Sequence, residues 1–132
     1  MSVTATEKQR LSNVVKREQW PELGFTRTVA TAYEAAAKTY RVGEVLGKIS
    51  ASGKVKAAVE TAVDGSKVFY AICLEDKTVP ATTDTSVLVM YRGDAAVNKA
   101  GIYLDSTYDD ATKKGVIYTA IEAARIELLE AV

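Results

Sequence analysis

The most constraining feature of this sequence is a series of short apolar stretches, each bounded by glycine or aspartate turns. The stretches are rich in valine, threonine, isoleucine and tyrosine, which favour strands, and some alternate apolar and polar positions. Turn dipeptides such as Ser52-Gly53 and Asp64-Gly65 separate them, so we expect mostly antiparallel pairing. Strands are predicted within residues 26–32, 40–49, 54–63, 67–74, 85–91 and 95–104. Glycines inside the second stretch predict a bulge, a bend or a close backbone approach.

The last part of the chain changes from strand to helix periodicity. Ser106 and Asp109 have the spacing of a capping box. The apolar residues that follow share one helical face: Ile117, Ala120, Ile121, Ala124 and Leu128. This pattern predicts a C-terminal helix that leaves little room for a final strand. Ile126 and Leu129 lie off the stripe, so they are either simply exposed or form a subunit interface.

Residues 1–24 differ from the rest of the chain because they are polar, charged and without sustained alternation. We interpret them as an extended N-terminal arm, with at most a weak helix in residues 6–19, and expect the core to close without them. The predicted fold class is therefore α+β. It is a small β-rich single domain, residues 25–132, with mostly antiparallel short strands, one C-terminal helix and the arm.

Composition argues for a structural subunit rather than an enzyme. The chain has no histidine and one cysteine, and it carries no recognisable nucleophile or phosphate-binding motif. We therefore expect no catalytic residues, no metal and no cofactor. Most apolar residues are alanine and valine, which bury little area each, so the core should be thin and completed by oligomerisation.

The charge pattern excludes some partners. Lys and Arg balance Asp and Glu at 17 each, so no overall field attracts nucleic acid or a membrane surface. The first segment is nevertheless basic and the last acidic, which is either ordinary solvated surface or a sign that the two ends face different partners. The first ten residues do not form a signal peptide, and no apolar stretch approaches the roughly 20 residues of a membrane span. We expect synthesis in a reducing cytoplasm.

Five segments in this order resemble the head decoration proteins of lambda-type tailed phages. They are residues 43–49 (GEVLGKI), 52–54 (SGK), 62–66 (AVDGS), 71–76 (AICLED) and 87–97 (VLVMYRGDAAV). Each segment alone is common, whereas the series is specific. The resemblance covers about residues 25–104, and it implies a terminal helix as well.

The resemblance implies a non-enzymatic virion protein on the outer surface of the expanded capsid, made in the bacterial host cytoplasm. Such proteins cement the head against packaged DNA by clamping neighbouring major capsid proteins, usually as homotrimers, although a dimer is an alternative here. The arm of this family pairs with capsid protein as an added strand. The capsid-contact residues expected in the arm and at its base are Lys8, Arg10, Lys16, Arg17, Trp20, Leu23 and Phe25. The alternative function is a carbohydrate- or cell-surface-binding β domain.

Overall fold

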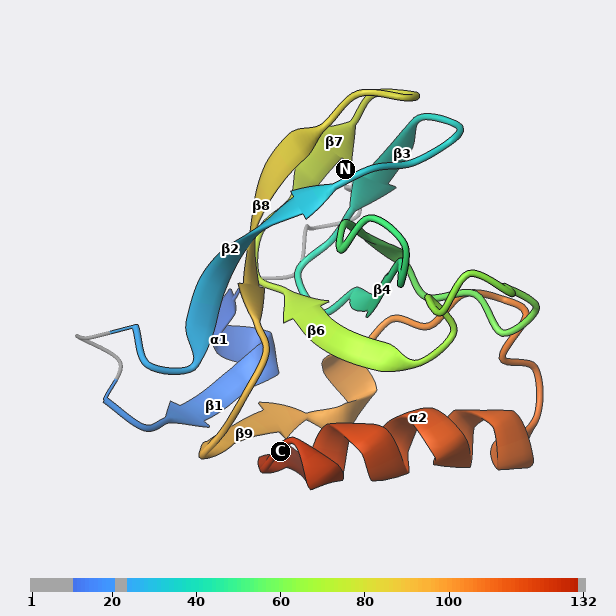
Figure 1. Ribbon diagram of the computed structural model, residues 1–132. Coiled ribbons are helices and arrows are strands. Elements are labelled where there is room, and N and C mark those ends of the chain that lie inside the picture. The colour runs from blue at the N-terminus through green and yellow to red at the C-terminus, as the bar shows by residue number, and fades with distance from the viewer. Residues whose placement is uncertain (1–10, 21–23, 131–132) are drawn as a thin grey trace, which may run out of the picture.

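The computed structural model describes residues 11–20 and 24–130, in which a small barrel stands on a three-stranded sheet and a helix (Figure 1). Chain order begins with α1 (Leu11–Val14), β1 (Val15–Glu18), β2 (Arg27–Ala32), β3 (Lys38–Tyr40), β4 (Val45–Lys48) and β5 (Val55–Ala57). It continues with β6 (Phe69–Cys73), β7 (Lys77–Val79), β8 (Thr85–Met90), β9 (Ala95–Asn98), η2 (Lys99–Gly101), α2 (Ala111–Ala123) and β10 (Ile126–Leu129). The predicted class, a small β-rich α+β domain, is confirmed.

Five strands close the barrel in the order β2-β5-β4-β6-β8. All neighbouring pairs are antiparallel except β2 and β5, which run parallel and share one register pair, Ala32 with Val55. Strands β3 and β7 form a separate antiparallel ribbon beside the barrel. Mostly antiparallel pairing was the sequence prediction and is confirmed, although only β4 and β5 are consecutive strands joined by a turn, while the other antiparallel pairs join strands that are not consecutive in the chain.

The inner face of the barrel is filled almost entirely by small side chains. Alternate residues of β8 and β6 point inward, such as Val87, Val89 and Ala71, while their neighbours point outward. The inner cluster is Ala32, Tyr40, Leu46, Val55, Ala57, Ala71, Cys73, Val79, Val87 and Val89. The abundance of alanine and valine therefore matches the narrow space inside a five-stranded barrel.

A second cluster lies between the barrel, the sheet β1-β9-β10 and α2. Ile72 and Met90 reach it from the outer faces of β6 and β8, and Ile117 and Ile121 reach it from α2. The helix starts later than predicted, because the Asp110 side chain caps it by accepting a hydrogen bond from the Lys113 N–H at 2.8 Å. Among the described residues, no helix is long and apolar enough to cross a membrane.

The structure corrects two predicted elements. The C-terminal helix ends at Ala123, and Ile126–Leu129 forms β10, which pairs in parallel with β9. This pairing outcompetes the helical pattern because it buries Ile126 completely. The strand expected within residues 54–63 is limited to β5, Val55–Ala57, and the chain then turns toward the Asp64-Gly65 loop.

Gly47 confirms the expected close backbone approach. A Cβ added to Gly47 would lie 1.8 Å from the Ser66 carbonyl oxygen, while one added to Gly115 in α2 would meet nothing within 4 Å. We expect Gly47→Ala to lower the free energy of unfolding by about 3 kcal/mol, because the Ser66 backbone must move. Gly115→Ala should raise it by about 1 kcal/mol, because alanine favours the helix. Urea unfolding measures the free energy of unfolding of both variants. The same change in this free energy for Gly47→Ala and Gly115→Ala would contradict the close backbone approach at Gly47.

Candidate functional site

The structure describes four of the seven residues predicted to contact a capsid. Lys8, Arg10 and Leu23 lie outside the described residues. Lys16 and Arg17 are exposed on β1, an outer strand of the sheet β1-β9-β10. Trp20 and Phe25 lie at the turn between β1 and β2, and this turn is the part of the predicted site with the most distinctive geometry.

Residues 11–18 are packed into the domain rather than standing apart from it. Val14 is fully buried in the cluster beneath the barrel, and β1 pairs antiparallel with β9 from Val15 to Glu18. The expectation that the core closes without the arm is therefore wrong for this stretch. The sequence signal was weak because β1 is only four residues long and half of it is exposed.

A buried ion pair holds the end of β1 against the start of β2. The Glu18 carboxylate accepts hydrogen bonds from Arg27 Nε at 2.8 Å and Nη2 at 2.5 Å, and from the buried Thr26 hydroxyl at 2.5 Å. The Glu18 side chain is only 6% exposed. The hydrogen bond from Arg27 holds the pKa of Glu18 below its ordinary value, and the same bond raises the pKa of Arg27.

This ion pair supports an exposed aromatic and cationic surface that we call the Trp20 platform: Trp20, Phe25, Tyr91 and Arg92. The Trp20 and Phe25 rings meet edge to face, with centroids 5.0 Å apart. The Arg92 guanidinium lies 4.1 Å from the Phe25 ring centre, and its Nε donates to the Phe25 carbonyl oxygen at 2.7 Å. Trp20 is 51% exposed, although it is a large hydrophobic residue. A half-exposed tryptophan in a group that also contains an exposed arginine is typical of a protein interface.

Sequence reasoning missed Tyr91 and Arg92, because Arg92-Gly93-Asp94 reads as an ordinary turn. The Tyr91 N–H donates to the Thr26 carbonyl oxygen at 3.0 Å, which extends the β2–β8 ladder by one pair and brings Arg92 next to Phe25. Only the register between two distant strands reveals this neighbourhood.

The two residues predicted to form a subunit interface have different surroundings. Ile126 is fully buried in the chain's own core, so it presents no surface to a second subunit. Leu129, at the end of β10, is half-buried, and an interface there stays a prediction. The basic first segment and the acidic last segment are paired with each other at one point, because Arg17 Nη2 on β1 lies 3.7 Å from Glu127 Oε2 on β10.

Two carboxylates, those of Glu34 and Glu44, are buried in the domain. Glu34 accepts hydrogen bonds from the Tyr40 hydroxyl and, at 2.8 Å, from the Ala57 N–H, which joins the segment after β2 to β3 of the ribbon and β5 of the barrel. Burial, together with Glu34, raises the pKa of Tyr40, and burial raises the pKa of Glu44. Within the described part of the chain, no cluster of His, Cys, Asp and Glu could hold a metal ion.

Comparison with known proteins identifies one family. The family model described as bacteriophage lambda head decoration protein D matches residues 4–126. No curated protein sequence matches the chain. The matched range includes the barrel, the Trp20 platform and β1.

The Glu18–Arg27 pair should make part of the stability pH-dependent. The folded pKa of Glu18 lies below its unfolded value, so its contribution is complete above the unfolded pKa of about 4.3 and is lost as the pH falls through the folded pKa. We expect Glu18→Gln to lower the free energy of unfolding by about 2 kcal/mol at pH 7. The difference from the native protein should shrink as the pH falls below the unfolded pKa of about 4.3.

Urea unfolding at pH 7 and pH 3 measures this difference. The control is Glu127→Gln, which removes the exposed pair with Arg17 and should change the free energy of unfolding by less than about 0.5 kcal/mol at both pH values. A deficit for Glu18→Gln that is as large at pH 3 as at pH 7 would refute the assignment.

Proposed function

Because the chain belongs to the family of the bacteriophage lambda head decoration protein D, we propose that it cements the expanded head of a tailed phage. It binds the outer capsid surface and clamps neighbouring major capsid proteins, which stabilises the head against the pressure of packaged DNA. The observation that carries this mechanism is the Trp20 platform, in which a half-exposed tryptophan packs edge to face on Phe25, and Phe25 in turn lies against Arg92.

The proposed contact has two parts. The Trp20 platform supplies an aromatic anchor, which loses little conformational entropy because its rings are already held. The residues that precede Leu11, with Lys8 and Arg10, supply a strand to the capsid protein, so that backbone hydrogen bonds tolerate slightly different capsid sites. In this proposal residues 1–24 remain the contact segment and residues 25–132 the domain, with residues 11–18 fixing the segment to the domain.

We propose further that the protein has no enzymatic activity and acts on the head as a homotrimer, with a dimer as the alternative. A trimer presents three contact segments at once, so its avidity exceeds the affinity of one subunit. It is made in the bacterial host cytoplasm and works on the virion. A carbohydrate-binding role has no comparable support, because Tyr40 and Tyr108 are buried and the other tyrosines are partly buried at separate places.

Two truncations separate capsid binding from folding. Deleting residues 2–10 should leave the melting temperature within a few degrees of the full chain and weaken co-sedimentation with expanded, undecorated heads. Deleting residues 2–19 removes Val14, β1 and Glu18, so we expect loss of cooperative folding or a melting temperature lower by at least about 10 °C. If the variant that lacks residues 2–10 binds heads as tightly as the full chain, these residues are not part of the capsid contact.

The anchor is tested by Trp20→Ala. A buried interface tryptophan contributes about 2 kcal/mol or more, so we expect affinity for expanded heads to fall about 30-fold per site without a change in melting temperature. The matched control is Val63→Ala, at a fully exposed apolar residue on another loop, which should bind as the native chain does. Quantitative co-sedimentation measures both. Equal affinities for the two variants would remove the Trp20 platform from the mechanism.

A further inference from the structure

One edge of β2 is almost unpaired although the barrel is closed. Strand β8 pairs with all six residues of β2, whereas β5 pairs only with Ala32. Thr26 accepts from the Tyr91 N–H, so the even-numbered residues of β2 exchange hydrogen bonds with β8. The odd-numbered residues Val29 and Thr31 therefore direct their N–H groups toward the other edge. Tyr33 follows the same pattern, because its N–H donates to the Val55 carbonyl oxygen at 2.9 Å.

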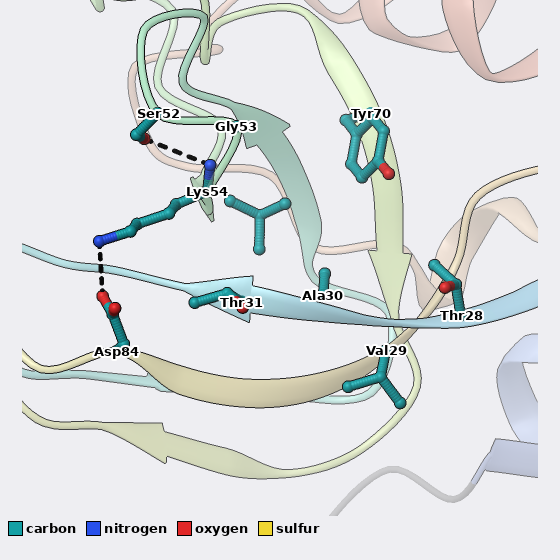
Figure 2. Close-up of a pocket in the computed structure, with 10 residues that line it drawn as sticks. Thr28, Val29, Ala30, Thr31, Ser52, Gly53, Lys54, Tyr70 and Asp84 are labelled. Carbon is teal, nitrogen blue, oxygen red and sulfur yellow. Dashed lines mark hydrogen bonds and ion pairs between the residues drawn. The ribbon is translucent and has the colours of Figure 1, made fainter.

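A groove lies along this edge. It encloses about 380 Å³ between Thr28–Thr31 of β2 on one side and the turn at Ser52, Gly53 and Lys54, together with Tyr70 of β6, on the other. Figure 2 shows Tyr70 across the groove from β2, and Lys54 reaching Asp84 at one end. We call this space the β2 groove. Val29 within it is 66% exposed, an unusual state for a valine in a barrel strand.

The β2 groove is lined by one ion pair, and one further cation, Lys48, borders it beside Gly53 and Tyr70. Lys54 is neutralised by Asp84 at 2.9 Å. Lys48 lies with its ammonium 5.0 Å from the Tyr70 ring centre, and among the described residues it forms no salt bridge. One uncompensated cation beside a strand edge fits an extended segment that carries a carboxylate.

We propose that an extended segment of the major capsid protein, with small or β-branched side chains and one carboxylate facing Lys48, adds as a strand to β2 in this groove. The inference rests on the proposed cementing function and names a second contact within it. The edge supplies the N–H groups of Val29 and Thr31, and the segment needs small side chains because Ala30 and Tyr70 line the interior side. The groove is continuous with the proposed capsid contact, since Phe25 lies two residues before the start of β2.

Residue-resolved amide hydrogen exchange tests the added strand on the full chain. The protein is compared free and bound to expanded, undecorated heads. Exchange at Val29 and Thr31 should slow at least tenfold on the heads. The amides of Thr28 and Ala30, which face β8, should change far less and so serve as an internal control. Binding to heads with unchanged exchange at Val29 and Thr31 overturns the inference but leaves the cementing function in place. Failure to bind heads at all would overturn both.

Variants supply a second measurement. Val29→Pro removes an N–H that β8 does not use, so the ladder survives, and affinity for heads should fall about tenfold. Lys48→Gln should weaken binding several-fold and reduce its dependence on salt. Lys67→Gln, at an exposed lysine on another loop, should bind as the native chain does. If Lys48→Gln and Lys67→Gln bind equally, the carboxylate partner is excluded.

Discussion

The narrow interior of the five-stranded barrel is the constraint on which the rest of the structure depends. Mostly small side chains fill it, and β4, β6 and β8 also face a second apolar cluster on their outer side. Ile72 and Ala71 illustrate this, because adjacent residues of β6 are both fully buried on opposite faces. These strands are therefore buried on both faces, so that turns and strand edges remain for contacts with other molecules.

The proposed contact surfaces follow from this division. The Trp20 platform is a turn, and it can be ordered because the Glu18–Arg27 pair closes its base out of solvent. The β2 groove is an edge, and it exists because β5 is too short to follow β2 beyond Ala32.

The barrel strands, the class of fold and the family could be predicted from the sequence because they depend on local alternation and turn residues, whereas β1, β7 and β10 were not predicted. The C-terminal boundary could not be predicted either. Leu128 fits a helix by spacing, but pairing with β9 decides its state, and that pairing joins segments separated by α2. The Trp20 platform could be predicted only in part, for a similar reason. Trp20 and Phe25 are close along the chain, whereas Arg92 lies next to Phe25 only because β2 and β8 pair in this register.

The position of β9 between β1 and β10 sets an order of events during synthesis. Most of the barrel, from β2 to β8, is complete in the chain before the last strand has been made. The sheet beneath it needs β10, the final strand, and β10 closes over the same β9 that receives β1. Cotranslational folding can therefore close the barrel first, while the sheet β1-β9-β10 is completed only after β10 has left the ribosome.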